Sequence, residues 1–361
     1  MIYKQNYTLL TFYKFVDVKN PEEEVEKHLT FCNDIWMKWR IYIWTEWISS
    51  TVTCNEWQLK AYKLYLDNHE LFNNPPDLDL KSTKVDWHKF PKMIVKLREE
   101  IVVLWKKYTK DEIEKAWNRM TVEDFKNLID NEKIDDYVIL DMRNNHEYKL
   151  GHFKNAIPAN TLNFRDLDNQ IEKYKKQFKN KKIISYCTGW IRCEKATVML
   201  QKAWLKNTYQ LDGWVVKYIN TYNDWNWLGN LYVFDDRVSD YVWDEKTHSV
   251  IWECSYSWKK TDNCENCRYS PCNARLIADK KEYEKHFGFC SQECAEKAIE
   301  DILVKKTHFD PMNYKSKRLE IKNNPELKNE IIESIRIHLK SNIKWIDFNH
   351  KLSQKEDFIL D

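Results

Sequence analysis

The stretch KKIISYCTGWIRCEKA, residues 181–196, decides the fold of the central part of this chain. Its apolar start is typical of a short strand that is buried on both faces of a parallel sheet. A turn follows, and a helix is expected to begin near Glu194. Functional groups gather at the carboxyl ends of parallel strands. We therefore expect a site at the residues of this turn: Cys187, Thr188, Gly189, Trp190, Ile191 and Arg192.

Similar short apolar runs lie on either side of this stretch. YVILDMR (137–143) and NTYQLDG (207–213) are separated from it by sequence with helical character, and MTVEDFKNLI (120–129) has a threonine N-cap before an amphipathic helix. Alternating strands and helices of this kind predict an α/β domain with a parallel sheet. We place this domain at residues 119–229.

The first part of the chain, residues 1–118, alternates differently. Its segments suit the order of a βαββαβ unit, and they predict an N-terminal ferredoxin-like (split βαβ) α+β domain. The expected strands are YTLLTFYKFV (7–16), RIYIW (40–44) and PKMIVKLREEIVVL (91–104), and the expected helices are PEEEVEKHLTFCNDI (21–35) and NEWQLKAYKLYL (55–66).

Composition restricts the class of protein. The chain has 361 residues, of which 43% are apolar and 32% charged, as in soluble globular proteins. No apolar run of eighteen residues and no signal-peptide pattern is present, so we expect a cytoplasmic protein with no membrane partner. The net charge is only +2. A nucleic-acid partner would therefore have to bind a local basic surface.

Cys187 has the surroundings of a reactive thiol. Successive backbone N–H groups and the N-terminus of the following helix favour an anion, either a thiolate or a persulfide, and Arg192 adds a positive charge. The alternative is a buried cysteine that acts as a small apolar residue. Cys193 is either a second redox thiol or, more simply, a cysteine of the core. Asp141 and Arg143 end a strand near the same edge of the sheet.

A cysteine-rich segment, residues 230–300, follows the α/β domain. Cys264 and Cys267 have CxxC spacing, and Cys290 and Cys294 have CxxxC spacing. Paired thiolates of this kind build structural zinc sites, so we predict these four as ligands, with Cys254 and Cys272 as substitutes. Reduced free thiols remain the alternative. The remaining residues, 301–361, read as a lysine-rich helical tail with an amphipathic helix near residues 323–343.

Several long motifs resemble a known family. The stretches 139–160, 186–196 and 209–219 resemble a rhodanese domain. The flanking sequence narrows the resemblance to the rhodanese-domain tRNA uridine hydroxylases. The motifs that do so are residues 13–32 and 39–52 before the rhodanese-like stretches and LYVFDDRVS (231–239) after them. The resemblance covers about residues 7–294.

This resemblance implies a function. Members of the family use molecular oxygen to make 5-hydroxyuridine at the wobble position of tRNA, which implies Cys187 as the catalytic residue and the anticodon loop as the partner. It implies that Asp141 and Arg143 brace the loop. We expect Lys38, Arg40 and Lys60 to hold phosphates. The resemblance implies molecular oxygen as co-substrate, although no flavin or nucleotide motif is present. Structural zinc, expected from the cysteine spacing, is the only metal component predicted. A sulfurtransferase with a persulfide at Cys187 is the alternative function.

Glycine and tryptophan are present in unusual numbers. The chain has 5 glycines and 17 tryptophans, whereas an average chain of this length has about 25 glycines. The family loop reads C-T-G-G-I-R, and Trp190 replaces its second glycine. The same exchange occurs in other family motifs, at Trp39, Trp47, Trp105, Trp204, Trp214 and Trp252.

A single exchange repeated at so many sites indicates a UGA codon that the organism decodes as glycine and that is translated here as tryptophan. A genuine Trp190 would block the loop, since glycine lets backbone amides approach an anion. The chain would then be an inactive RNA-binding homologue. Trp227 matches a tryptophan of the pattern, and Trp243 and Trp345 are left unassigned.

Overall fold

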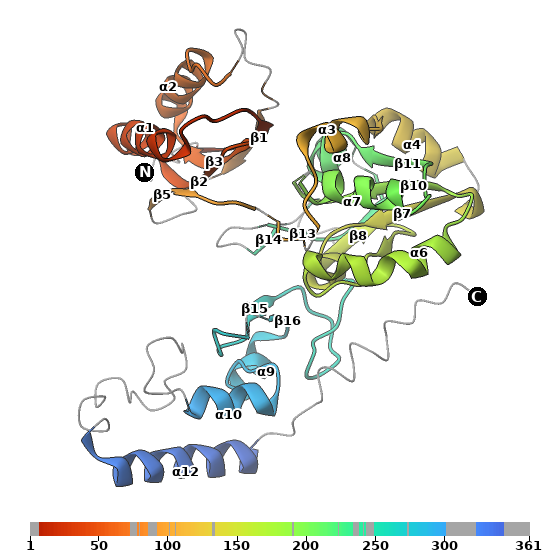
Figure 1. Cartoon of the computed structure of the whole chain (residues 1–361). Helices are drawn as coiled ribbons and strands as arrows, with labels where there is room; N and C mark the ends of the chain where they lie inside the picture. The colour runs from red at the N-terminus through yellow and green to blue at the C-terminus, as the bar shows by residue number, and fades with distance from the viewer. Residues whose placement is uncertain are drawn as a thin grey trace, which may run out of the picture.

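The structure is a computed structural model. It describes residues 7–72, 78, 80–85, 92–100, 102–104, 106–131, 134–189, 191–222, 224–233, 238–240, 242, 249–272, 274–300 and 323–342. Trp105, Trp190, Trp243 and Trp345 lie outside these residues. Three units follow one another along the chain (Figure 1): an N-terminal unit, a central α/β unit and a cysteine-rich unit.

The N-terminal unit is a five-stranded sheet with two helices. Its strands lie in the order β4-β1-β3-β2-β5, and all pairs are antiparallel except β2 with β5. This order confirms the predicted ferredoxin-like arrangement. The elements are β1 (Tyr7–Phe15), α1 (Pro21–Asp34), β2 (Lys38–Trp44), β3 (Trp47–Cys54), α2 (Glu56–Asp67), β4 (Lys81–Val85) and β5 (Met93–Leu97).

One predicted strand of this unit was too long. The strand predicted over residues 91–104 ends at Leu97, because the charged residues Arg98, Glu99 and Glu100 follow. The hairpin partner β3 and the edge strand β4 were not predicted as strands. Leu10 and Phe12 of β1 are buried against the helices, as the period of two requires, and their neighbours Thr11 and Tyr13 point to the opposite face.

The central unit is a parallel sheet covered on both sides, as predicted. The strand order is β6-β11-β10-β7-β9, and every pair is parallel. Its strands are β6 (Arg119–Met120), β7 (Tyr137–Asp141), β9 (Ile157–Pro158), β10 (Lys182–Tyr186) and β11 (Thr208–Leu211). Its helices are α3 (Lys110–Lys115), α4 (Val122–Asn131), α5 (Asn145–Leu150), α6 (Ile171–Gln177), α7 (Ile191–Lys202) and α8 (Trp214–Thr221), with 3-10 turns η1 (Ile134–Asp136) and η2 (Phe164–Gln170).

Alternate residues of one strand enter two different cores. Ile183 of β10 packs with residues of α6 and α7, and its neighbour Ile184 packs with residues of α4 and α8. Both faces of the sheet are therefore apolar, which explains the uninterrupted apolar runs in the sequence. Helix α7 begins at Ile191 rather than near Glu194 as predicted, so its N-terminus lies closer to Cys187 in the sequence.

Apart from the helix α12, the cysteine-rich unit contains short elements. Two small sheets, β8 with β12 and β13 with β14, lie at its junction with the central unit, and a third, β15 with β16, belongs to the unit itself. The bounds are β8 (Gly151–Phe153), β12 (Trp227–Gly229), β13 (Leu231–Tyr232), β14 (Ser239–Asp240), β15 (Cys264–Asn266), β16 (Arg275–Ile277), α9 (Lys280–Lys285), α10 (Gln292–Glu300) and α12 (Pro325–Asn342).

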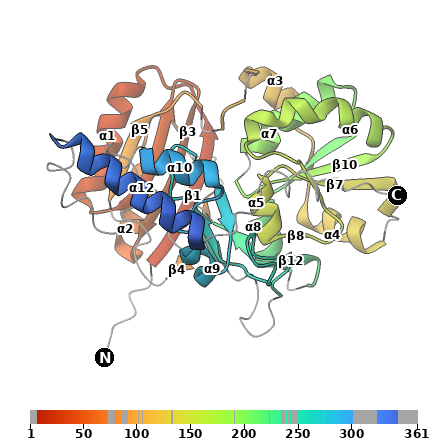
Figure 2. The ribbon, with the colours of Figure 1, turned by 90° about the horizontal axis from the view of Figure 1, so that it is seen from below.

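The predicted tail helix is confirmed as α12. It runs beside α10 (Figures 1 and 2), and its Ile332 enters the core of the cysteine-rich unit. Among the described residues, no helix has the length and apolar character needed to cross a membrane. The bounds predicted for the four parts of the chain stay predictions.

Candidate functional site

Cys187 lies at the carboxyl end of β10, with the N-terminus of α7 ahead of it. Its side chain is buried, and its sulfur accepts hydrogen bonds from the backbone N–H groups of Gly189 and Cys193 and from the Cys193 thiol. Two main-chain N–H groups thus contact the sulfur, and the role predicted for the whole loop stays a prediction. Cys193 is in contact with Cys187 and also belongs to the core, and its role as a second redox thiol stays a prediction.

These contacts favour the charged form of the sulfur. Burial alone would raise the pKa of Cys187. The hydrogen bond from the Cys193 thiol, the charge of Arg192 and the two backbone N–H groups outweigh burial, and the pKa of Cys187 falls below the usual value of a thiol. The pKa of Cys193 is raised by burial and by its role as the donor to Cys187. The geometry therefore describes one thiolate supported by a neighbouring thiol.

Arg192 is held in place by a carboxylate that the sequence analysis did not assign to the site. Its Nη1 and Nη2 donate to Glu147 Oε1 and Oε2 at 2.5 and 2.8 Å, and both side chains are buried. Burial raises the pKa of Glu147, but the adjacent Arg192 lowers it further than burial raises it. The Thr188 hydroxyl also donates to Glu147, at 3.5 Å. Helix α5 thus holds Arg192, the positive charge of the cysteine loop, in place through Glu147.

Asp141 and Arg143 form a second buried pair, below the loop. Arg143 Nη2 donates to Asp141 Oδ2 at 2.5 Å and to the Gly151 carbonyl at 2.6 Å. The hydroxyl of Tyr186, the residue before Cys187, donates to the same carboxylate at 2.7 Å. Neither Asp141 nor Arg143 lines the cavity that Cys187 faces. Their contacts are those of residues that position the end of β10.

Glu194 is a further buried acid beside the loop that the sequence analysis missed. It follows Cys193 in α7 and is only 2% exposed. Burial raises its pKa to about 8, and the charge of Cys187 adds to this effect, while Arg119 opposes it. Glu194 therefore carries its proton at neutral pH. A lone Glu in a helical pattern gives no sequence signal for such a state.

Cys187 opens into a cavity between the central unit and the N-terminal sheet. The cavity has a volume of about 690 Å³. Thr188, Gly189, Ile191 and Arg192 line it beside Cys187. On the opposite wall lie residues of the uncovered face of the N-terminal sheet: Leu9, Thr11, Tyr13, Trp39, Arg40, Tyr42, Ser49, Thr51 and Thr83. A volume of this size accommodates a nucleobase with its ribose and phosphate.

Of the three residues predicted to bind phosphate, one lies at the cavity. Arg40 lines it, whereas Lys38 and Lys60 do not. Lys60 is exposed on α2 and pairs with Glu56 at 2.9 Å. Two further arginines of the cavity wall, Arg98 and Arg165, were missed, because one follows a strand and the other opens a 3-10 turn, where spacing gives no signal.

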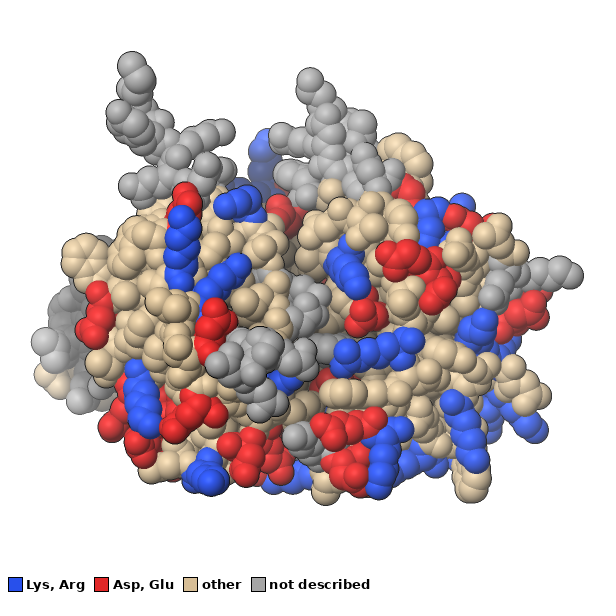
Figure 3. Space-filling view, turned by 90° about the horizontal axis from the view of Figure 1, so that it is seen from above, with Lys and Arg blue, Asp and Glu red and all other residues tan. Residues whose placement is uncertain are grey.

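The surface charge fits a local site rather than a broad basic face. Basic and acidic side chains are interspersed over the face shown in Figure 3.

Arg40 and Arg98 lie over the ring of Tyr42, with their guanidinium carbons 5.6 and 5.2 Å from its centre. Planar cations beside an aromatic ring are an arrangement that also suits contact with a base and its phosphate.

The predicted metal ligands are corrected at one position. Cys267, Cys290 and Cys294 lie together as predicted, but the fourth member of the group is Cys272. Cys264 instead packs with Leu150, Tyr232 and Ile277. The CxxC spacing was misleading because Cys264 lies within β15, where alternate side chains point to opposite faces. Cys254 lies outside the group and accepts a hydrogen bond from the Asp279 N–H at 3.2 Å.

A buried acid with two histidines in the N-terminal unit was also missed. Glu24 Oε1 lies 2.6 Å from His28 Nδ1 and 2.9 Å from His69 Nε2. The two histidines hold the pKa of Glu24 at about 2, against the effect of burial, which raises it. This cluster joins α1 to the residues after α2 on the side of the sheet away from the cavity.

The fold and the cysteine loop define a rhodanese-like protein with an added N-terminal domain. Residues 121–221 match the family described as rhodanese-like domain, residues 7–101 the UPF0176 acylphosphatase like domain, and residues 228–295 the rhodanase C-terminal domain. The solution structure of the rhodanese-like domain of Alr3790 from Anabaena sp. is similar at 17% identity, with a TM-score of 0.26, over 31% of this chain and 78% of that one.

The particular family follows from longer matches. The tRNA uridine(34) hydroxylases of Staphylococcus aureus strains COL and Newman are each 34% identical to this chain over 294 residues. These matches cover 80% of this chain and 90% of each relative. The chain belongs to the tRNA uridine(34) hydroxylase family, and it is an enzyme.

The lowered pKa of Cys187 predicts unusual reactivity towards alkylation. Because only the thiolate reacts, its rate with iodoacetamide should reach half its maximum clearly below pH 8.5, near which an ordinary thiol titrates. Replacing Cys193 by alanine removes one donor and should move this midpoint to higher pH. Mass spectrometry of the alkylated peptide measures both.

Cys32 is the internal control, because burial raises its pKa to about 12. A Cys187 midpoint at or above that of an ordinary thiol would contradict the described environment, as would an unchanged midpoint in Cys193→Ala.

Proposed function

We propose that this enzyme hydroxylates the wobble uridine of tRNA at C5, with molecular oxygen as the oxidant and Cys187 as the nucleophile. The observation that carries the proposal is the position of Cys187: a sulfur held by backbone donors at the inner wall of a cavity that faces the N-terminal sheet. The names of the Staphylococcus aureus relatives support the substrate and the reaction. tRNA functions in the cytoplasm, which we therefore propose as the site of the reaction.

The cavity explains how a single base would be presented to the sulfur. A uridine of the anticodon loop is not paired, so it leaves the stack at small cost. Tyr13 and Tyr42 offer aromatic surface on the sheet side, and Arg40, Arg98 and Arg165 offer positive charge for the flanking phosphates. Uridine C6 would lie towards Cys187. The N-terminal domain would then select RNA, and the rhodanese-like domain would perform the reaction.

The chemistry follows from the thiolate. Addition of Cys187 Sγ to C6 of the uracil would place negative charge at C5, the carbon that gains oxygen. Reaction of C5 with molecular oxygen and a proton gives a hydroperoxide. Two thiols of a small-molecule or protein reductant would convert it to the alcohol, with release of water and formation of a disulfide. Loss of the C5 proton and of the Cys187 thiolate restores the ring double bond.

A sulfurtransferase is the second candidate, and one observation favours it. Backbone donors around Cys187 would stabilise a terminal persulfide as well as a thiolate. The cavity favours the first candidate, because the strands of the N-terminal sheet supply ten of its lining residues, and transfer of one sulfur atom needs no surface of that size.

Nucleoside analysis tests the proposal. Incubation of unmodified tRNA with the enzyme, oxygen and a thiol should produce 5-hydroxyuridine, and exclusion of oxygen should stop it. Cys187→Ser should lower the rate by about a thousandfold or more, since a hydroxyl is a far weaker nucleophile. Cys54→Ser is the matched control, because Cys54 lies in the N-terminal core, away from the cavity, and should retain activity.

If the enzyme forms thiocyanate from thiosulfate and cyanide and leaves tRNA unchanged, the hydroxylase proposal is wrong and the sulfurtransferase is the better function. The assay should include the enzyme with glycine at position 190, since the family loop has glycine there.

The arginines of the cavity wall predict a defect in RNA binding. Arg98→Ala should raise KM for tRNA with little effect on kcat, and should lower the slope of log affinity against log salt by about one. Lys60→Ala is the matched control, as Lys60 is a solvent-exposed cation off the cavity. Filter binding at several salt concentrations measures the slope. If Arg98→Ala and Lys60→Ala change KM and the salt slope equally, the cavity wall is not part of the RNA-binding site.

A further inference from the structure

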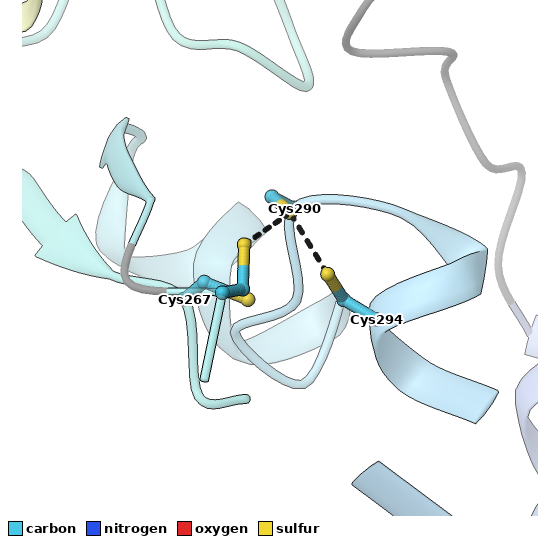
Figure 4. A group of neighbouring side chains, drawn as sticks. Cys267, Cys290 and Cys294 are labelled. Atoms are coloured by element: carbon cyan, nitrogen blue, oxygen red, sulfur yellow. Dashed lines mark hydrogen bonds between the residues drawn. The ribbon is translucent and has the colours of Figure 1, made fainter. Parts of the chain in front are cut away.

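Four cysteines of the C-terminal unit converge on one point. The sulfurs of Cys267, Cys272, Cys290 and Cys294 all lie within 4.8 Å of one another, and none of the four forms a disulfide. The Cys290 sulfur lies 3.6 Å from that of Cys272 and 3.4 Å from that of Cys294. Figure 4 shows Cys267, Cys290 and Cys294 pointing toward one another, Cys290 and Cys294 from the segment that enters α10 and Cys267 from another.

These separations match a tetrahedral metal site. With four zinc–sulfur bonds of about 2.3 Å, neighbouring sulfurs lie about 3.8 Å apart. The backbone also fits, since the N–H groups of Cys290 and Ala274 donate to the sulfurs of Cys267 and Cys272. Donors of this kind orient thiolate ligands and offset their charge. Four thiolates without a metal would repel one another at this distance.

The four ligands join two segments, which also meet in the apolar core around Phe289 and through the hydrogen bond from the Arg268 N–H to the Gly288 carbonyl at 2.8 Å. Cys267 and Cys272 belong to the connection between β15 and β16, each of which has only 3 residues. Cys290 and Cys294 lie at the start of α10, a helix of 9 residues. Apart from α12, the elements of this unit are short, and small domains of this kind commonly depend on metals or disulfides for stability.

We propose that Cys267, Cys272, Cys290 and Cys294 bind one structural zinc ion. All four positions are protein ligands, so the ion has no open coordination site and takes no part in a reaction. Its role is to hold the β15–β16 connection to α10, and with α10 the core that receives Ile332 of α12. This proposal does not depend on the reaction at Cys187.

Metal analysis of the purified enzyme tests this site. Inductively coupled plasma mass spectrometry should find one zinc per chain. Cys272→Ser should lose the zinc and should unfold at a lower temperature. Cys264→Ser should keep it, because Cys264 is a buried cysteine of the same unit that packs elsewhere. Cys272→His, which preserves a ligand, should retain zinc even if the serine variant fails to fold.

Equal zinc content in Cys272→Ser and the parent enzyme would overturn the ligand set, and so would loss of zinc in Cys264→Ser alone. Less than a stoichiometric amount of zinc in the parent enzyme, or iron in its place, would overturn the assignment of zinc. In the parent enzyme, a chelator should remove zinc and lower the melting temperature, and an unchanged melting temperature would exclude the structural role.

A second inference rests on the backbone at five tryptophans. Trp36 and Trp204 each follow a helix, with φ of 58° and 69°. After α1, the N–H of Trp36 donates to Asn33 O at 3.0 Å and that of Met37 to Cys32 O at 2.8 Å. After α7, the N–H of Trp204 donates to Gln201 O and that of Leu205 to Leu200 O, both at 3.0 Å.

This pair of hydrogen bonds is the Schellman motif, whose left-handed residue is usually glycine. A bulky residue is a conformational outlier at that position. Both tryptophans are 77% exposed, so no burial of the ring offsets the strain. The backbone at both positions is therefore that of a helix C-terminus at which glycine is the usual residue.

Three more tryptophans have the same backbone feature. Trp39 in β2 has φ of 108°, and Trp214 and Trp258 each have φ of 64°. Trp39 and Trp214 also line the cavity in front of Cys187, where their rings occupy space that a substrate would need. Trp227 differs from all five, because it has no positive φ, is buried, and packs edge-on against Phe153 at 5.1 Å.

We infer that Trp36, Trp39, Trp204, Trp214 and Trp258 are glycine in the protein that the native cell makes, and that Trp227 is tryptophan. One codon decoded in two ways accounts for the deficit of glycine and the excess of tryptophan. The backbone evidence at these positions is independent of the family pattern. It adds Trp36 and Trp258 to the positions that the pattern identified.

Peptide mass spectrometry of the enzyme from its native cells tests this inference. Peptides that contain positions 36, 204 and 214 should have the mass of glycine, and the peptide with position 227 that of tryptophan. In recombinant protein, Trp204→Gly should raise the melting temperature because it removes the strained residue, whereas Trp227→Gly should lower it because it empties a packed core site. Tryptophan in the native peptides would overturn the inference, as would a melting temperature that falls in Trp204→Gly.

Discussion

The negative charge of a buried thiolate must be stabilised by groups of the protein itself, and the active-site loop of this structure depends on that constraint. Cys187 ends a strand of a sheet covered on both faces, where bulk water cannot stabilise charge. Backbone N–H groups, the N-terminus of α7 and the Arg192 guanidinium replace the water. Arg192 in turn would be a costly buried cation without Glu147. The pair of Arg192 with Glu147 is therefore a condition for the thiolate, and the pair of Asp141 with Arg143 positions the strand end before it.

The second requirement is a wall opposite the sulfur, and the N-terminal sheet supplies it. Its helices cover one face, which receives Leu10 and Phe12, and leave the other free. The period of two along β1 then brings Thr11 and Tyr13 to the free face. A ferredoxin-like sheet covered on one side only is suited to bind a partner on its other side. The cavity exists because this free face and the cysteine loop face each other.

The sequence predicted secondary structure better than it predicted contacts between residues that are distant in the sequence. The parallel strands, Cys187 at a strand end, and Asp141 and Arg143 at the end of a neighbouring strand depend on local pattern, and the structure contains them. The ion pair between Asp141 and Arg143 was not predicted. Glu147 and Arg98 were missed because their roles depend on distant residues: Glu147 pairs with Arg192, 45 positions away, and Arg98 shares the cavity wall with Cys187. Cys272 was given only as a substitute ligand, because the CxxC spacing does not show which way Cys264 leaves its short strand. The positive φ values were foreseen only where a family pattern had glycine, since tryptophan itself gives no sign of the backbone beneath it.

The cysteine-rich unit is connected to the reactive loop through α5. Leu150, the last residue of α5, packs with Cys264 of β15 and Ile277 of β16, and Glu147 lies one turn earlier on the same helix. Because a helix of six residues has little stability of its own, its position depends on what it packs against. Glu147 sets the position of Arg192, and Arg192 faces the sulfur. The C-terminal unit therefore contributes to the charge state of Cys187, although none of its own cysteines lines the cavity. A rhodanese-like domain cut out at residue 229 would retain the sheet and Cys187 but would lose the surface that holds α5.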